Sequence, residues 1–251
     1  MAFHFEFLKQ MTPEIVAVAT QKIQELKVRP NISKVDIVDE FQHIAGDVIG
    51  RVFFGEDFTH NPRNKHFTEI VGITTRRLLD MEFLTPYYFM FGIKFIKAGI
   101  FAQHRDHNKK ISALKSHSMK LVKEKMENIA KEYEELSKTK HRKNLIEIFY
   151  EQRKTHPDDP LTDNEIRDLF LNFYVAGMDT TASLVSMASY YAMKNPECKK
   201  KILQEMSEVL RDPASATYDD ISKLNYTTAF LKEVMRFSGP APMNIPRTAT
   251  Q

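Results

Sequence analysis

The stretch from Asp163 to Asn195 constrains the fold of this chain most, because it predicts one long helix with a buried face. Thr162 and Glu165 fit a capping box, in which each side chain accepts a hydrogen bond from the other residue's backbone N–H. The buried face follows i, i+3, i+4 spacing and carries Ile166, Leu169, Phe170, Phe173, Tyr174, Gly177, Thr181, Leu184, Val185 and Ala188. Asn195 precedes Pro196 and therefore ends the helix. At about 1.5 Å per residue, the helix would be roughly 48 Å long and cross a whole domain.

The composition of the chain favours an all-α, mainly helical fold. Of 251 residues, 42% are hydrophobic and 27% are charged, which is ordinary for a globular protein. Glycines number only eight, helix formers are abundant, and alternating strand patterns are few. With no internal repeat and no low-complexity linker, we expect a single domain over residues 1–251.

Further helices are predicted over 13–28, from Asp36 to a stop at Gly55, and over 65–81, 104–135 and 145–153. Pro13 suits the first turn of the first of these helices, because its missing N–H would be unpaired there anyway. The inward face of this helix is predicted to carry Ile15, Val16, Ala19, Ile23 and Leu26.

Charge and cysteine content exclude several classes of protein. The formal net charge of +3 is small and no basic patch with interleaved aromatic residues is present, so we expect no nucleic acid partner. A single cysteine, Cys198, excludes intrachain disulfides and a multi-cysteine zinc site. His104 and His107 have the i, i+3 spacing of a metal pair, but no third ligand is evident, so we expect surface histidines. The first residues lack the basic and apolar regions of a signal peptide, and no stretch reaches the roughly 18 apolar residues of a spanning helix.

The middle of the long helix carries small and polar residues that a helix interior seldom has: Ala176, Gly177, Met178, Asp179, Thr180 and Thr181. Gly177 costs about 1 kcal/mol relative to alanine at such a position. The small side chains leave space for a flat group against the helix, and a hydroxyl beside a carboxylate offers a donor and an acceptor for proton transfer. Two structural explanations stay open. One is a close helix crossing with Asp179 in water, and the other is a threonine that bends the helix by bonding the i−4 carbonyl.

This hexapeptide resembles the Ala/Gly-Gly-x-Asp/Glu-Thr-Thr segment of the cytochrome P450 family, the haem-thiolate monooxygenases. A second segment, Tyr226 followed by Glu233 and Arg236, resembles the Glu-x-x-Arg helix of the same family. The proline-containing run over 240–249 resembles the segment that follows, and 195–206 resembles the connecting helix. Order and spacing agree over residues 162–250, whereas upstream the likeness is helix for helix.

The resemblance implies haem (iron protoporphyrin) as cofactor and assigns roles to residues of the long helix. Ala176 and Gly177 would lie over the porphyrin face, where their small size leaves room for dioxygen. Thr180 would hydrogen-bond the oxygen bound to the iron, and Asp179 would relay protons through water. Asp179 and Thr180 are therefore the candidate catalytic residues, and Thr180 is also a cofactor contact. In the alternative, Asp179 makes only a structural pair.

The resemblance also assigns roles to charged residues near the end of the chain. Glu233 and Arg236 would form a structural ion pair that is buried behind the haem and braces the fold. The alternative is an exposed pair, which is usually worth under about 1 kcal/mol. Arg247 would contact a haem propionate, since a guanidinium suits a carboxylate. For Arg247, the alternative is an arginine in a surface turn.

The chain departs from the family at the axial ligand of the iron, which should be a cysteine in a glycine-containing loop near the end of the chain. Cys198 instead lies on the connecting helix, remote from that place, and we interpret it as an ordinary thiol. The chain ends at Gln251, and the family's anchor, first strands and Trp-x-x-x-Arg helix are not found. We therefore expect a fragment with the axial cysteine outside this chain, no metal ligand within it, and no activity of the fragment alone.

The function expected of the full-length protein is that of a haem-dependent monooxygenase. It would insert one oxygen atom from O2 into a small apolar organic substrate, with electrons from an NADPH-dependent reductase. The competing hypothesis is a non-catalytic helical module that keeps the fold and has lost the haem-ligand loop. If the full-length protein carries an N-terminal anchor, the expected location is the endoplasmic reticulum membrane, on its cytosolic face. Residues 83–101, rich in Phe, Tyr, Ile and Met, would make a peripheral membrane contact, and the alternative is a loop that covers the core.

Overall fold

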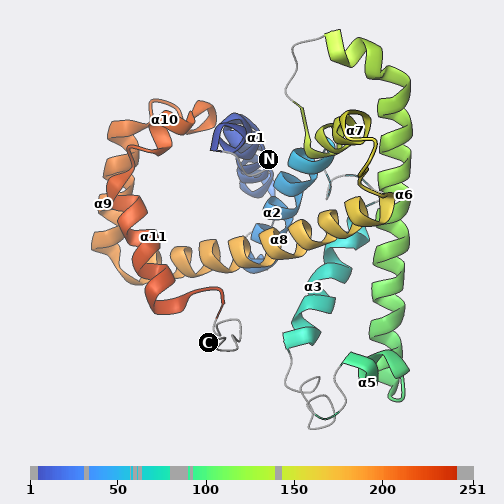
Figure 1. Ribbon diagram of the computed structural model, residues 1–251. Coiled ribbons are helices and arrows are strands. Elements are labelled where there is room, and N and C mark those ends of the chain that lie inside the picture. Colours follow the sequence, from blue (N-terminus) through green and yellow to red (C-terminus); the bar gives the residue numbers. More distant parts are fainter. Residues whose placement is uncertain are drawn as a thin grey trace, which may run out of the picture. The chain divides into compact units, whose positions relative to one another are not determined.

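The structure is a computed structural model that describes residues 5–30, 34–56, 58, 61, 64–79, 90, 93–138 and 143–241. Every regular element in these ranges is a helix, which confirms the all-α prediction (Figure 1). The elements are α1 (Phe5–Val28), α2 (Ile37–Phe54), α3 (Lys65–Leu79), α5 (Ile93–Ala98), α6 (Ala102–Lys138), α7 (Leu145–Thr155), α8 (Asp163–Lys194), α9 (Pro196–Val209), the short 3-10 helix η2 (Pro213–Ser215), α10 (Tyr218–Ile221) and α11 (Asn225–Ser238). Of the helix predicted over 65–81, residues 80 and 81 lie outside the described ranges.

The chain divides into two compact units, one formed by Met1–Val48 with Gly177–Gln251 and the other by Ile49–Ala176. The first unit contains α1, α9, η2, α10 and α11, and the second contains α3, α5, α6 and α7. Helices α2 and α8 each contribute residues to both units. The single domain predicted over residues 1–251 stays a prediction.

Aromatic rings fill the core of the unit formed by Ile49–Ala176. Phe53, Phe58, Phe170 and Tyr174 are all 0% exposed. The ring centroids of Phe53 and Phe170 are 5.0 Å apart, and those of Phe58 and Tyr174 are 5.1 Å apart. In the same core, the hydroxyls of Thr68 on α3 and Tyr174 on α8 share a hydrogen bond of 2.6 Å. Large buried rings and a satisfied tyrosine hydroxyl therefore anchor the first half of α8.

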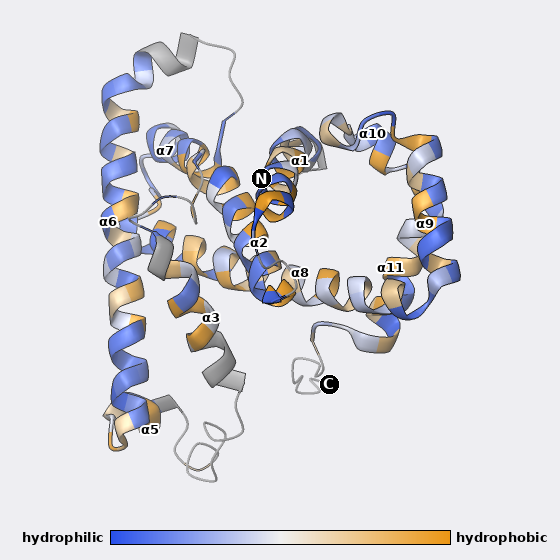
Figure 2. Ribbon diagram, turned by 180° about the vertical axis from the view of Figure 1, so that it is seen from behind, coloured by the Kyte–Doolittle hydropathy of each residue, from blue (hydrophilic) through white to orange (hydrophobic). Residues whose placement is uncertain are grey.

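The long helix α6 lies beside α3 and α7 in the same unit (Figure 1). It spans a little more than the predicted 104–135 and buries a narrow apolar face made of Leu114, Leu121, Val122, Met126 and Ile129. The rest of its surface is mostly hydrophilic (Figure 2). This pattern is typical of a helix that contacts the core along one stripe only.

The prediction of surface histidines at the start of α6 is wrong, because His104 and His107 are each only 5% exposed. Helix α5 packs on α6, and the rings of Phe95 and Phe101 each lie 5.3 Å from the ring of His104. The described part of the chain nevertheless holds no group of three His, Cys, Asp or Glu side chains that could bind a metal ion. Within the same ranges, no helix combines the length and apolar character needed to cross a bilayer.

Helix α1 begins earlier than predicted, and it buries a different face from the predicted one. It begins at Phe5, and Pro13 lies inside it at an exposed position, where the helix tolerates the loss of one backbone hydrogen bond. Ile15 and Ile23, predicted to face inward, are 43% and 51% exposed, whereas Lys22 is only 7% exposed. The Lys22 ammonium pairs with the Glu40 carboxylate of α2 at 3.1 Å, and the same side of α1 buries Met11 and Val18.

The signals predicted at the ends of α2 and α8 are confirmed. Oδ1 of Asp36 accepts a hydrogen bond from the backbone N–H of Val38 at 2.9 Å, and Gly55 follows α2 with φ of 74°, a left-handed conformation that favours glycine. At the start of α8, the Glu165 N–H donates to Thr162 Oγ1 at 3.2 Å, and the Thr162 N–H donates to Glu165 Oε2 at 2.7 Å. These are local interactions that need no other part of the chain.

Helix α11 is capped by a residue of another helix. The backbone N–H groups of Tyr226 and Thr227 donate to the Glu205 carboxylate of α9 at 2.6 and 2.8 Å, and the Thr227 hydroxyl donates to it at 2.7 Å. Leu224, at the N-cap position of α11, makes no capping bond with its side chain. Glu205 therefore satisfies N–H groups that the first turn of α11 leaves unpaired and complements the helix dipole.

Candidate functional site

Helix α8 carries the candidate site near its middle. Most of its buried residues step by four along the helix, namely Ile166, Phe170, Tyr174, Met178, Ala182 and Ser186, and Ala188 is buried as well. The predicted face is correct as far as Tyr174 and again at Ala188, but Thr181 is exposed and Gly177 is only half-buried. A repeat of four residues drifts around a helix of 3.6 residues per turn, so Met178 continues the buried stripe where Gly177 was predicted.

The residues predicted to face the cofactor form a surface of small side chains on α8. Ala176 and Thr180, one helical turn apart, are both exposed, and Gly177 is half-buried. The backbone stays α-helical throughout this stretch, so Gly177 does not interrupt the helix. The structure therefore brings the small side chains of Ala176, Gly177 and Thr180 to one side of α8.

Asp179, the predicted proton relay, is half-buried and contacts α2. The Nε2 of Gln42, a residue that is 8% exposed, donates a hydrogen bond to Oδ1 of Asp179 at 2.9 Å. In the described part of the chain, no cation pairs with this carboxylate. Sequence reasoning missed Gln42, since it lies 137 positions away and no local pattern distinguishes it.

Glu233 and Arg236 form the predicted pair on α11. Nε and Nη2 of Arg236 donate to the two carboxylate oxygens of Glu233 at 2.8 and 2.6 Å, and these hydrogen bonds lower the pKa of the Glu233 carboxyl. The side chains of Arg236 and Glu233 are 68% and 63% exposed, so in this chain the pair lies on the surface and not in the buried setting that the resemblance implied. Phe237 is 70% exposed as well, so the described residues leave this side of α11 open.

Two further predicted positions have different outcomes. Arg247, the expected propionate contact, lies outside the described residues. Cys198 is half-buried in the first turn of α9, and a hydrogen bond with its thiol raises the pKa of the Tyr226 hydroxyl. This packing contact between α9 and α11 agrees with the interpretation of Cys198 as an ordinary thiol.

The α8 surface fits one face of a flat macrocycle such as haem. Ala176 and Gly177 add little bulk to this surface, and the exposed Thr180 places a hydroxyl beside them. A hydroxyl and a carboxylate suit hydrogen bonds to an oxygen ligand, whereas a haem-thiolate iron takes a cysteine from the protein. The residues on α8 would therefore suit a position against such a cofactor, and none of them is the cysteine that a haem-thiolate iron takes.

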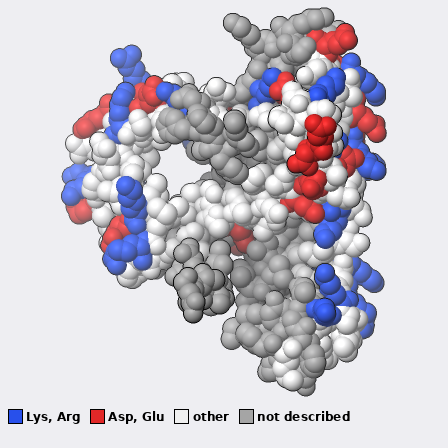
Figure 3. Space-filling model, viewed as in Figure 1, with Lys and Arg blue, Asp and Glu red and all other residues white. Residues whose placement is uncertain are grey.

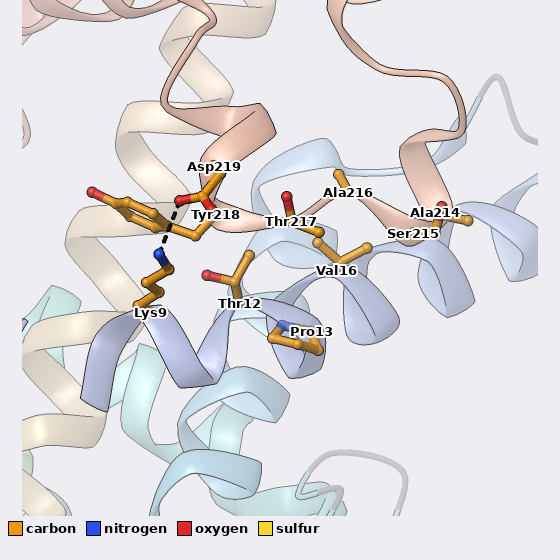
Figure 4. A pocket seen from close by; sticks show the side chains of 10 residues that line it. All are labelled: Lys9, Thr12, Pro13, Val16, Ala214, Ser215, Ala216, Thr217, Tyr218 and Asp219. Atoms are coloured by element: carbon orange, nitrogen blue, oxygen red, sulfur yellow. Dashed lines mark hydrogen bonds and ion pairs between the residues drawn. The ribbon is translucent and has the colours of Figure 1, made fainter. Parts of the chain in front are cut away.

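A pocket of about 250 Å³ lies apart from these residues, between α1 and the segment from η2 to α10 (Figure 4). Lys9, Thr12 and Val16 contribute one wall, and residues 214–219 contribute the other. Lys9 forms an ion pair with Asp219 at 2.9 Å across the pocket. No residue of α8 lines it, so this pocket is separate from the candidate site.

Charges of both signs are interspersed on the molecular face shown in Figure 3. Lys and Arg lie among Asp and Glu over the upper part of α6 and over the segment from α9 to α11, whereas around α5 and the start of α6 the charged side chains in view are Lys and Arg.

Residues 1–251 match the sequence model of the family described as Cytochrome P450. The chain belongs to the cytochrome P450 family. Cytochrome P450 71A8 of Mentha piperita is 34% identical over 131 residues, which are 52% of this chain and 24% of that protein. A self-sufficient cytochrome P450 monooxygenase of Phanerodontia chrysosporium is 39% identical over 106 residues, 42% of this chain and 10% of that protein. A desmethyl-deoxy-podophyllotoxin synthase of Sinopodophyllum hexandrum is 26% identical over 219 residues, 86% of this chain and 41% of that protein.

These matches confirm the predicted family, and they also show that the chain spans less than half the length of these relatives. The roles of Ala176, Gly177, Asp179 and Thr180 stay predictions. The same holds for Glu233, Arg236 and Arg247.

Proposed function

We propose that the complete protein is a haem-dependent monooxygenase that inserts one oxygen atom from O2 into a small apolar organic substrate. The observation that carries this proposal is the juxtaposition on α8 of a small-residue surface, an exposed Thr180 and the hydrogen-bonded carboxylate of Asp179. Membership of the cytochrome P450 family supports the same class of reaction, and one relative is described as a monooxygenase.

When bound, the haem supplies the redox chemistry that activates O2, with electrons from an NADPH-dependent reductase. The residues of this chain would hold and cover it. Ala176 and Gly177 would lie against one face of the macrocycle and keep larger side chains away from it. Arg247 would hold a propionate by a charge-assisted hydrogen bond, for which a guanidinium is well suited.

The proton chemistry would fall to Thr180 and Asp179. A threonine hydroxyl both donates and accepts hydrogen bonds, so Thr180 can hand a proton on without carrying a charge itself. The Asp179 carboxylate can accept a proton from water and release it again. Positioned proton transfer of this kind contributes about 10²–10⁴-fold to a reaction rate.

The proposal includes a peripheral membrane contact through residues 83–101. Ile100 and Phe101 are 61% and 49% exposed, and Lys94 and Lys97 are exposed as well. Exposed apolar side chains beside lysines, whose stems are apolar and whose heads are charged, suit the interface of a bilayer. Residues 83–89, 91 and 92, the rest of the aromatic part, lie outside the described ranges. A location on the cytosolic face of the endoplasmic reticulum would follow if the complete protein carries an anchor.

The test is Thr180→Ala in the complete protein, with Thr228→Ala on the exposed side of α11 as the matched control. Thr180→Ala should retain haem and substrate binding but divert electrons to hydrogen peroxide. We expect the product formed per nicotinamide consumed to fall by about tenfold or more, because a positioned proton donor is lost. Thr228→Ala should leave this ratio unchanged. An unchanged ratio in Thr180→Ala would contradict the role of the α8 surface.

The competing hypothesis, a non-catalytic helical module, gives a different result. A module that has lost its haem-ligand loop would show no thiolate-type Soret band when the complete protein is mixed with haem, reduced and exposed to carbon monoxide. The monooxygenase should show this band before any substrate is identified.

A further inference from the structure

Three consecutive residues of α8 lie in three different environments. Met178 is 0% exposed, Thr180 is exposed, and Asp179 is half-buried between them. Successive side chains on an α-helix turn by about 100°, so neighbours in sequence necessarily face different surroundings. Asp179 therefore lies at the border between the packed side of α8 and the surface that carries Thr180.

The first part of α2 supplies the contact at this border. Gln42 is almost fully buried at 8% exposure, and its Nε2 donates to Oδ1 of Asp179 at 2.9 Å. A buried amide and a half-buried carboxylate each need a hydrogen-bond partner, and here each serves the other. The bond joins residues 137 positions apart, so it depends on how α2 packs against α8.

The chemistry of the donor matters. A lysine or arginine at this place would add a positive charge, whereas the amide of Gln42 carries none and does not titrate. Its hydrogen bond therefore sets the direction of the Asp179 carboxylate without introducing a second charged group. Within the described ranges, this amide donates to Oδ1, and no other group there donates to Oδ2.

We propose that Gln42 is a positioning residue that holds Oδ1 of Asp179 and so reserves Oδ2 for passing protons towards Thr180. Oδ2 accepts a proton that solvent delivers through a water molecule and releases it to the Thr180 hydroxyl as that hydroxyl hands on its own proton, so both groups return to their starting state after each transfer. This inference rests on the proposed monooxygenase function. It adds Gln42 on α2, a residue that the hexapeptide of α8 does not predict.

The test compares two glutamines that make the same kind of bond. Gln204 on α9 also donates to a carboxylate at 2.9 Å, that of Glu208, but this pair is exposed and both of its residues belong to α9. Gln42→Met and Gln204→Met in the haem-loaded complete protein both replace an amide with an unbranched apolar chain. Gln42→Met should lower the product per nicotinamide by about tenfold, which is less than the 10²–10⁴-fold that positioned proton transfer supplies in full, because Asp179 itself is retained. KM should change by less than about twofold, because substrate binding is untouched. Gln204→Met should change neither quantity.

A second readout needs no turnover. In protein labelled with ¹³C at its aspartate carboxylates, the infrared difference between wild type and Asp179→Asn identifies the band of Asp179. Gln42→Met should shift this band, because it removes the hydrogen bond to Oδ1. Gln204→Met should leave it in place. If Gln42→Met does not load haem, Gln42→Asn replaces it, since the shorter side chain keeps an amide but cannot span the same distance to Asp179.

Each outcome tests either the positioning role of Gln42 or the proton relay on which that role depends. A shifted band together with a lower product ratio supports the positioning role of Gln42. An unchanged product ratio overturns that role, and so does a lower ratio with an unshifted band, because the hydrogen bond would then not be the cause. If Asp179→Asn and Thr180→Ala both leave the ratio unchanged, the proton relay of the proposed function fails, and the role of Gln42 fails with it.

Discussion

Arg236 holds Glu233 in a bidentate ion pair of 2.8 and 2.6 Å, although their side chains are 68% and 63% exposed. Exposed pairs contribute little to stability, because water screens the charges and both side chains lose conformational freedom. A pair that becomes buried behaves differently, since loss of either partner leaves an uncompensated charge out of water. The importance of this pair therefore depends on whether the complete protein covers this side of α11.

The first prediction concerns the Glu233–Arg236 pair in the complete protein. Glu233→Ala or Arg236→Ala should lower the yield of soluble, haem-loaded protein severalfold and leave the selectivity among products unchanged. The double variant should be less impaired than either single one, because no unpaired charge is left behind. Lys232→Ala, an exposed neighbour on α11, is the matched control. Single variants that accumulate like wild type with a full complement of haem would show that the pair is only a surface contact.

The second prediction concerns the buried hydroxyl pair of Thr68 and Tyr174. Thr68→Val should lower the free energy of unfolding by about 1–3 kcal/mol, because it leaves the Tyr174 hydroxyl without its partner in the aromatic core. The double variant Thr68→Val with Tyr174→Phe should lose less than the sum of the two single variants. Urea unfolding followed by circular dichroism measures all three, with Thr228→Val at an exposed helix position as the control. Strict additivity would show that the two hydroxyls do not interact.

The third prediction concerns the dependence of stability on pH near α1 and α2. Burial and then the charge of Lys22 lower the pKa of His43 below its ordinary value of 6.5. The unfolded chain therefore binds a proton at this histidine more readily than the folded chain does, and stability falls as the pH drops below about 6.5. His43→Gln should flatten this fall between pH 7.5 and pH 5.5, as urea midpoints at the two values will show. His156→Gln, at an exposed position, should not flatten it.

Glu40, close to His43 in sequence on α2, causes a second loss of stability at lower pH. Burial alone would raise the pKa of the Glu40 carboxyl, but hydrogen bonds and positive charges from Arg29 and Lys22 hold it below the ordinary 4.5. Its contribution to stability is therefore present above pH 4.5 and is lost as the pH falls through the lowered pKa. If the stability of wild type and of His43→Gln changes equally with pH above pH 5.5, His43 is not the cause of the loss of stability below about pH 6.5.

The fourth prediction concerns the thiol of this chain. Cys198 lies in the first turn of α9 beside Tyr226, so it should not be the ligand of a haem iron. Residues 1–251 mixed with haem, reduced and exposed to carbon monoxide should show no red-shifted thiolate-type Soret band. In the complete protein, Cys198→Ser should retain that band. A band that Cys198→Ser abolishes would identify Cys198 as the ligand and overturn its interpretation as an ordinary thiol.

Most helix positions and several helix ends were predictable from the sequence. The capping box of Thr162 and Glu165, the start at Asp36 and the stop at Gly55 all depend on groups within a few residues of one another. Hydrophobic spacing likewise predicted α8 to within one residue of its observed end at Lys194. Such signals are local, because a backbone N–H or a positive φ is satisfied by the nearest side chain or by glycine itself.

The hexapeptide of α8 also predicted where the site lies on the chain. Ala176 and Thr180 share an exposed helix surface because residues four apart on an α-helix lie on the same side. The family assignment followed from this hexapeptide and the Glu-x-x-Arg pattern, and the comparison confirms it. Both inferences use only the order and spacing of residues.

Packing between helices decided the rest. The buried side of α1 includes Lys22, which pairs with Glu40 of α2, and His104 is buried because α5 folds against α6. Gln42 contacts Asp179 across 137 positions, and Glu205 caps a helix that begins 20 residues later. Hydrophobic periodicity cannot reveal such contacts, because a polar residue in an amphipathic pattern is assigned to water. Only the tertiary arrangement shows which polar groups leave water, and each of these must then find its hydrogen-bond partner inside the fold.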